Sequence, residues 1–185
     1  MDSRLEEAIQ ARDRLVEIAK TFPTRALSEV CDVVLYHPKF VTQVGSAKEH
    51  HAYEGGLAIH TLEVTTYAMK MAEMFPTQTE QEVVGTAAIF HDFMKVKEYV
   101  PVKGGVVKTP YRNLIRHVAG SHAEFVKAIA GRGVKDEVAM RIEHAILAHH
   151  GRQDWGSPVE PQTAEAYILH YADMLSVRFG PGLVH

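Results

Sequence analysis

The chain has 185 residues, of which 46% are hydrophobic, and its 20 Lys and Arg against 23 Asp and Glu give a formal net charge of −3. This length and composition predict one globular domain and exclude a disordered chain. The charge gives no sign of a broadly basic nucleic-acid surface, so any anionic substrate must be held by local charge or by metal.

The single cysteine, Cys31, excludes an internal disulfide and suits a reducing compartment. The first residues lack the apolar core of a signal peptide, and no apolar run approaches the roughly 20 residues needed to cross a bilayer. We therefore expect a cytoplasmic protein with no membrane partner.

Apolar residues recur at helical spacing over residues 2–20, which predicts an amphipathic first helix. Thr24 is expected to cap a second helix over Arg25–Leu35. Residues 38–56 are expected to be irregular, with the pair Gly55-Gly56 allowing a turn that residues with side chains resist.

A long helix is expected over residues 57–75, and another from Thr79 to about Lys95. Two short β-prone runs between Tyr99 and Lys108 predict a hairpin. Further helices are predicted over residues 113–130, 134–150 and 162–179. The predicted fold class is therefore all-α, a helical bundle with at most one small β-hairpin.

Histidines and aspartates gather near helix ends and on apolar helix faces. A strongly apolar run ends in His91-Asp92, with Lys95 one turn further on. Unpaired burial costs about 2–7 kcal/mol for a polar group and more for a charge, and one metal ion would partner both residues at once. The other candidate ligands, from separate helices, are His60, His117, His122, His149, His150 and Asp173.

This mixture of imidazole and carboxylate suits Mn, Fe, Co, Ni or Zn, and the absence of cysteine excludes a structural thiolate zinc site. Each candidate taken alone also has an ordinary structural explanation. His60 would be a capped or solvated residue, His91-Asp92 a hydrogen-bonded helix end, and His149-His150 partners of a helix dipole. Their conjunction favours a metal site built from several helices of a bundle.

The order His60, His91-Asp92, Asp173 resembles the signature of the HD-domain metal-dependent phosphohydrolases. The similarity is closest to the HD module of the YhaM-type 3′–5′ exoribonucleases. It is carried by residues 50–57 (His-His-Ala-Tyr-Glu-Gly-Gly-Leu), 113–118, 149–151, 156–158 and 165–173. The resemblance implies a single HD domain over residues 1–185, with N-terminal helices in 1–37 and the HD core in 38–179.

The resemblance also implies a binuclear site with two divalent ions. His60, His91, Asp92 and Asp173 would hold one ion, and His117, His149 and His150 a second, with Asp92 bridging. Asp92 and Lys95 are the expected catalytic residues, Lys95 by contacting the scissile phosphate. The expected substrate-binding residues are His51, Tyr53, Arg116 and Arg152.

The chain departs from the family pattern at three points. Met94 stands where the family usually has Gly, which is expected to narrow the space beside the metals or to alter the helix end. Residues 1–37 are too few, and too helical, to form the OB-fold of the full exoribonucleases. Ser176 replaces an acidic residue. The surrounding Asn-Leu-Ile-Arg-His-Val favours His117 over His122 as a ligand.

We therefore expect a metal-dependent phosphohydrolase that uses a metal-activated water on a phosphodiester or nucleotide phosphoester, first of all at 3′ ends of single-stranded RNA or DNA. One alternative is hydrolysis of a small nucleotide, such as a dNTP, a mononucleotide or a cyclic dinucleotide. Another is a non-catalytic, metal-bound nucleotide-sensing module, which Met94 motivates. A third is an HD oxygenase with a di-iron centre.

Overall fold

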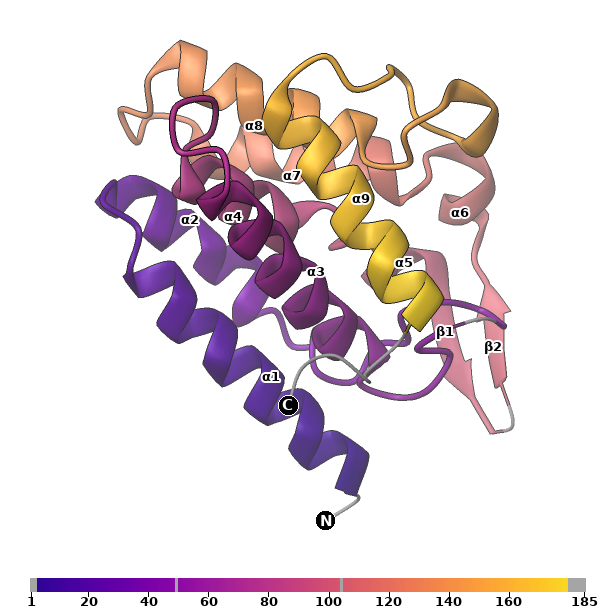
Figure 1. The fold of residues 1–185 in the computed structure, drawn as a ribbon. Coiled ribbons are helices and arrows are strands. Elements are labelled where there is room, and N and C mark those ends of the chain that lie inside the picture. Colours follow the sequence, from indigo (N-terminus) through magenta and orange to yellow (C-terminus); the bar gives the residue numbers. More distant parts are fainter. Residues whose placement is uncertain (1–2, 49, 104, 180–185) are drawn as a thin grey trace.

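Helices dominate the computed structural model, which describes residues 3–48, 50–103 and 105–179 (Figure 1). The helices are α1 (Ser3–Lys20), α2 (Arg25–Leu35), α3 (Gly56–Glu73), α4 (Gln81–Phe90), α5 (Lys95–Glu98), α6 (Pro110–Leu114), α7 (His117–Ile129), α8 (Asp136–Ala148) and α9 (Ala164–Phe179). The expected all-α class is thus confirmed. Of the single domain proposed for 1–185, residues 1–2 (which include Asp2, where the first helix was expected to begin), 49, 104 and 180–185 lie outside the described residues.

The predicted hairpin is confirmed as two antiparallel strands, β1 (Tyr99–Val102) and β2 (Gly105–Lys108). Tyr99 pairs with Lys108, and Val102 pairs with Gly105 across the short connection. Both strands are largely exposed. The hairpin is therefore an appendage of the helical bundle (Figure 1) and adds little to its core.

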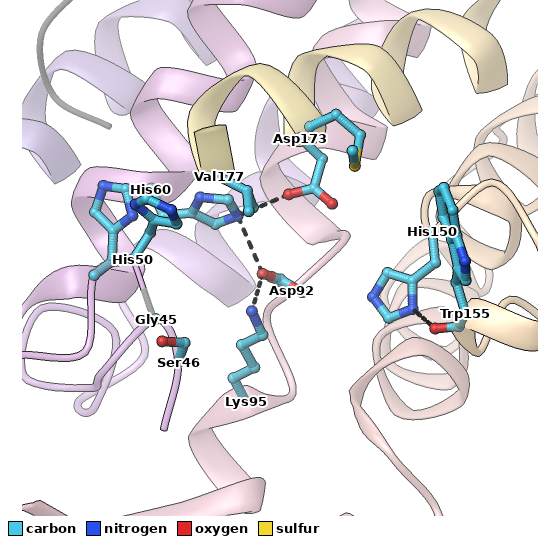
Figure 2. Close-up of a pocket in the computed structure, with 12 residues that line it drawn as sticks. Gly45, Ser46, His50, His60, Asp92, Lys95, His150, Trp155, Asp173 and Val177 are labelled. Carbon is cyan, nitrogen blue, oxygen red and sulfur yellow. Dashed lines mark hydrogen bonds and ion pairs between the residues drawn. The ribbon is translucent and has the colours of Figure 1, made fainter. Parts of the chain in front are cut away.

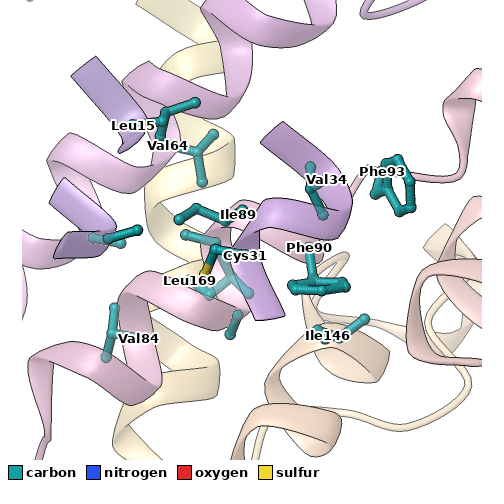
Figure 3. Packing of buried hydrophobic residues seen from close by; sticks show 14 of the residues in the cluster. Leu15, Cys31, Val34, Val64, Val84, Ile89, Phe90, Phe93, Ile146 and Leu169 are labelled. Carbon is teal, nitrogen blue, oxygen red and sulfur yellow. The ribbon is translucent and has the colours of Figure 1, made fainter. Parts of the chain in front are cut away.

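Helix α3 packs against α1, α4 and α9, and α4 also packs against α8 (Figure 1). The apolar run of α4 is buried on all sides, which explains why its sequence has no polar face. Phe90 at its end meets Phe125 of α7 edge to face, with the ring centroids 5.3 Å apart. Ile89, Ile146 and Leu169 fill the same core from α4, α8 and α9 (Figure 3). This packing brings the C-terminal end of α4 into the interior of the protein.

Two helices that the sequence predicts as continuous are interrupted. The helix expected to reach about Lys95 ends at Phe90, and a turn over residues 91–94 leads into α5. The helix expected over residues 113–130 is split between α6 and α7, where Arg116 has a φ of 67°. Both interruptions lie at residues that the sequence singles out as candidate ligands or their neighbours.

Met94 lies in the first of these turns with its side chain 1% exposed, inside the hydrophobic core. Its backbone N–H donates a hydrogen bond to Ser121 Oγ of α7 at 3.1 Å. This contact is made by the backbone, so it does not depend on the methionine side chain. The side chain, however, is packed with core residues and is absent from the lining of the pocket described below.

Thr24 stands at the N-terminus of α2, as expected, but its side chain does not cap that helix. Its hydroxyl and its backbone N–H instead donate hydrogen bonds to the two carboxylate oxygens of Glu82, at 2.8 and 2.7 Å. The expected local cap is replaced by a tertiary contact that fixes α2 on α4.

Within the described residues, no helix combines the length and the apolar character that crossing a bilayer requires.

Candidate metal centre

His91 and His149 each follow directly on a helix, His91 on the buried, apolar α4 and His149 on the amphipathic α8. Each Nδ1 lies 2.7 Å from the carbonyl oxygen three residues earlier, Ala88 O for His91 and Ile146 O for His149. The last carbonyls of a helix have no partner within it, so the imidazole satisfies one of them. Because a carbonyl only accepts, Nδ1 must carry the proton, and Nε2 is left with its lone pair directed into the protein.

His117 and His150 have their Nδ1 atoms occupied in the same way. His117 Nδ1–H donates to Glu98 Oε1 at 3.0 Å, and the same carboxylate oxygen accepts the His117 backbone N–H at 2.7 Å. His150 Nδ1–H donates to the carbonyl of Trp155 at 3.1 Å. Acceptors on Nδ1 fix the tautomer of a ligating histidine and raise the basicity of Nε2.

His60 Nδ1 also has an acceptor, supplied by Ser176 and supported by Glu63. The sequence did not predict this role for either residue. The His60 Nδ1 atom lies 2.9 Å from Ser176 Oγ, and Ser176 lies 2.6 Å from Glu63 Oε2. Since the serine hydroxyl donates to the carboxylate, its oxygen accepts from His60 Nδ1–H. Ser176 therefore links His60 to a carboxylate that is only 2% exposed.

Four residues, which we call the Asp173 cluster, converge at one point. They are His60, His91, Asp92 and Asp173. Figure 2 shows His60, Asp92 and Asp173 of this cluster. His60 Nε2 lies 3.2 Å from Asp92 Oδ2, 3.2 Å from Asp173 Oδ1 and 3.3 Å from His91 Nε2. Metal–ligand bonds of about 2.0–2.2 Å place neighbouring ligand atoms roughly 3.0–3.5 Å apart, which is the spacing found here.

A second group, the His150 cluster, consists of His117, His149 and His150, whose ring nitrogens lie within 4.8 Å of one another. His117 Nε2 is 3.2 Å from His150 Nε2 and 3.2 Å from Asp92 Oδ1. His149 Nε2 is 3.7 Å from the same Asp92 oxygen. The two oxygens of Asp92 thus face different clusters.

The residues present fit metal ions on a further observation. Asp92 Oδ1 and the Nε2 atom of His149 are buried and accept no hydrogen bond from any described residue, whereas Asp92 Oδ2 is contacted by the Lys95 ammonium. Buried polar atoms without partners are rare in native proteins. Both unpartnered atoms face the His150 cluster, so a divalent ion held there would satisfy them together.

The electrostatics of the two clusters differ. Burial disfavours the charged form of His149 and His150, and neighbouring imidazoles add to this, so the pKa of His149 lies well below its usual value and that of His150 is about 4. Burial acts against the charge of His60 as well, but hydrogen bonds to Asp173 and Asp92 outweigh it and raise the pKa of His60 to about 9.

Lys95 lies against the bridging carboxylate, with Nζ 2.5 Å from Asp92 Oδ2. Burial disfavours the ammonium, but Asp92 outweighs it, so the pKa of Lys95 is raised and the side chain stays charged. Burial would raise the pKa of Asp92, yet Lys95 and the nearby imidazoles hold it well below its usual value. A carboxylate that is 2% exposed therefore remains ionised.

A pocket of about 260 Å³ opens over these groups. The residues that line it include His51, His60, Lys95, His150, Trp155 and Asp173. His51 is 5% exposed, and its Nε2 lies 3.2 Å from Glu63 Oε2. Its backbone has a φ of 59°, and a Cβ on Gly56 would lie 2.1 Å from the His51 carbonyl oxygen, so the tight turn at this edge of the pocket requires glycine there.

Arg116 is the second non-glycine residue with a positive φ, and it is exposed and does not line the pocket. A Cβ built on Gly156 would lie 3.3 Å from Arg116 Nη1 and 3.4 Å from His150 Nδ1, so the guanidinium lies beside the His150 ring. Among the described residues it has no ion-pair partner. Strained backbone of this kind costs about 1–3 kcal/mol and is common at functional sites.

The structure does not bring three other sequence candidates to the pocket. The ring of Tyr53 packs against the Arg4 guanidinium of α1, 4.6 Å from its centroid, because the tight turn at Gly55 directs this segment toward α1. Arg152 is exposed, pairs with Asp154 and covers the Trp155 ring. His122 pairs with Glu143 at 2.7 Å on the outer face of α7, so His117 and not His122 lies in the cluster.

Comparison with known proteins gives one family. The model of the family described as HD domain matches residues 57–178. Three curated proteins named 3′–5′ exoribonuclease YhaM match over 146 residues, at 34% identity in Bacillus licheniformis and Bacillus pumilus and 33% in Bacillus subtilis. Each match covers 77% of this chain and 45% of the relative, so the chain spans less than half the length of these proteins. No solved structure matches the chain.

Proposed function

This chain belongs to the HD domain family, and from that membership we propose that it is a metal-dependent phosphohydrolase. The substrate we propose is a phosphodiester at the 3′ end of single-stranded nucleic acid, since the similar curated proteins are named 3′–5′ exoribonucleases.

One observation carries the proposal. Asp92 presents Oδ2 to His60 at 3.2 Å and Oδ1 to His117 at 3.2 Å, so a single carboxylate joins two sets of imidazole nitrogens. A bridging carboxylate between two groups of nitrogen ligands is the arrangement that a two-ion site needs. A hydrogen-bonded helix end does not need two such groups.

In this proposal the Asp173 cluster and the His150 cluster would each hold one divalent ion, with Asp92 shared. The imidazole-rich ligand set favours Mn, Fe, Co, Ni or Zn. The chemistry that two such ions supply is activation of a water nucleophile and neutralisation of charge on the phosphoryl oxygens.

The chain's own side chains would bind and orient the phosphate. The Lys95 ammonium is held at the pocket by Asp92 and is 15% exposed, so it can donate to a phosphate oxygen without reorganising. Arg116 has a guanidinium with no ion-pair partner among the described residues, beside His150. In this proposal it would bind a second oxygen or the adjacent phosphate.

The test is Asp92→Asn, which keeps the size of the side chain and removes its charge. We expect it to lose bound metal from both clusters and to lower turnover of a single-stranded oligonucleotide by about 1,000-fold or more. Elemental analysis and hydrolysis with added Mn, Co, Ni or Mg measure the two effects. The matched control is Asp154→Asn, at an exposed carboxylate. Normal turnover in a pure, folded Asp92→Asn sample would refute the proposal.

The size of the pocket supports a second candidate, hydrolysis of a small nucleotide. A volume of about 260 Å³ lies near the lower end of ligand sites and suits one nucleotide unit. Relative rates on oligonucleotides, mononucleotides, dNTPs and cyclic dinucleotides distinguish the two.

The non-catalytic alternative was motivated by Met94. The Met94 side chain lies in the core and not in the pocket, so this residue no longer supports that alternative.

A further inference from the structure

Trp155 is the only tryptophan of the chain, and it lies at the rim of the pocket. Its side chain is 52% exposed, although burying a tryptophan contributes more to stability than burying almost any other residue. Figure 2 shows it next to His150, across the pocket from Lys95. A large aromatic surface is thus left open to solvent beside the proposed metal ligands.

The backbone of Trp155 is held firmly, so its exposure is not that of a loose loop. It ends a 3-10 turn over Gln153–Trp155, in which its N–H donates to the carbonyl of Arg152 at 3.1 Å. Its own carbonyl accepts the Nδ1–H of His150 at 3.1 Å. One hydrogen bond therefore joins the backbone of Trp155 to a proposed metal ligand.

The indole has neighbours on only part of its surface. Arg152 Cζ lies 5.4 Å from the ring centroid, and the His170 ring lies 6.2 Å away at a 39° tilt. Other exposed aromatic residues of the neighbouring helix α9 are arranged differently. Tyr167 and Tyr171 stack on each other, 6.5 Å apart, and do not line the pocket.

We propose that Trp155 is the stacking surface for the nucleobase of the nucleotide whose phosphate reacts. The proposal rests on the proposed function and specifies how that site holds its substrate. The phosphate would lie between Lys95 and the two clusters, and the base would lie on the indole at the rim. Every base has a π-face, so stacking gives affinity without sequence preference, and the Arg152 guanidinium adds a cation above the same ring.

A binding measurement tests this without turnover. Because Trp155 is the only tryptophan, its fluorescence reports on this position alone. We expect zinc-loaded protein to be quenched by adenosine 5′-monophosphate and not by ribose 5-phosphate, which lacks only the base. A single-stranded oligonucleotide added to the same protein shows whether a strand end binds more tightly than a free nucleotide. No quenching by either base-bearing ligand at millimolar concentration, or equal quenching by ribose 5-phosphate, would overturn the proposal.

A kinetic measurement separates stacking from an indirect effect through His150. The probes are thymidine 5′-monophosphate p-nitrophenyl ester, which carries a base, and methyl p-nitrophenyl phosphate, which does not. We expect Trp155→Ala to raise KM for the thymidine ester by about 5- to 140-fold. The same substitution should leave kcat and KM for methyl p-nitrophenyl phosphate unchanged. Trp155→Phe, which keeps an aromatic ring, should have a KM for the thymidine ester close to that of the wild type. The control is Tyr167→Ala, at an exposed aromatic outside the pocket.

The outcomes distinguish this proposal from the function on which it rests. Wild-type protein that hydrolyses neither ester, yet is quenched only by base-bearing ligands, would refute the hydrolase and retain the stacking surface. Equal losses of kcat on both esters in Trp155→Ala would mean that the residue acts by orienting His150, and would overturn the stacking role.

Discussion

His91 and His149 are equivalent residues of two different helices. Each is the first residue beyond a helix, and each donates Nδ1–H at 2.7 Å to the carbonyl three residues earlier. Their ring centroids are 5.0 Å apart, yet His91 Nε2 belongs to the Asp173 cluster and His149 Nε2 to the His150 cluster. The C-terminal ends of two helices thus each deliver one imidazole to a proposed ion.

This equivalence predicts that the two residues lose different ions. We expect His91→Asn and His149→Asn each to reduce the metal content from about two ions per chain to about one. Elemental analysis gives the content, and His122→Asn, at a histidine outside both clusters, is the control. The assignment fails if either variant keeps both ions, or if the double variant still binds one.

Lys95 separates metal binding from turnover. Its ammonium neutralises Asp92 at 2.5 Å, so removing it should not weaken metal binding, while the phosphate loses a donor. We expect Lys95→Met to bind metal at least as tightly as the wild type and to hydrolyse substrate about 100-fold more slowly. Lys97→Met, at an exposed neighbour, is the control. Metal loss in Lys95→Met would argue against this role.

Ser176 and Glu63 are predicted to tune the ion of the Asp173 cluster through His60. Ser176→Ala removes the acceptor of His60 Nδ1–H, and we expect metal affinity to fall by about 10- to 100-fold. Competition with a fluorescent chelator measures the change. Ser157→Ala is a matched control, because Ser157 is equally buried and its hydroxyl contacts no partner among the described residues. Equal effects of both substitutions would contradict the relay.

The pKa of His60 predicts proton release on metal binding. With a pKa of about 9, raised above its ordinary 6.5, His60 carries a proton at pH 7 that an ion must displace. His150, with a pKa lowered to about 4, is neutral at pH 7 and has no proton on Nε2 for an ion to displace. We therefore expect about one proton to be released at pH 7 when the Asp173 cluster fills, and metal affinity there to rise with pH until about pH 9. Calorimetry in buffers of different ionisation enthalpy measures the release, and a release that does not change between pH 6 and 10 would contradict it.

Met94 is predicted to act on stability alone. Its side chain is 1% exposed in the core, so Met94→Ala should lower the free energy of unfolding by about 2–5 kcal/mol. Metal content per folded chain should stay unchanged. Urea denaturation measures the first effect, with Met140→Ala, at a residue 64% exposed, as the control. Loss of metal from folded Met94→Ala would contradict this prediction and show that Met94 supports the metal site.

Hydrophobic periodicity and turn residues in the sequence were enough to predict most elements. Helix α2 begins and ends as expected, and the hairpin follows from two β-prone runs. The breaks at residues 91–94 and 115–116 contain no Gly or Pro and could not be predicted in this way. They depend on tertiary partners, Ser121 for the Met94 N–H and Glu98 for the His117 N–H.

The candidate ligands were recognisable from residue type, position at helix ends and family resemblance. The supporting residues were not, because Ser176 and Glu63 are 113 positions apart and meet only in the folded chain. The sequence context of Trp155 predicts a loop, and only the carbonyl contact with His150 places it at the rim.

The ion pair between Lys95 and Asp92 also bears on how the protein is assembled. Small zinc domains are unfolded without their ion because nothing else neutralises their ligands. Here the Lys95 ammonium already lies beside the buried carboxylate of Asp92 and neutralises it. The polypeptide can therefore complete its folding first and acquire its ions afterwards, and stripping them with a chelator should be a reversible treatment that leaves an intact apoprotein ready for reloading.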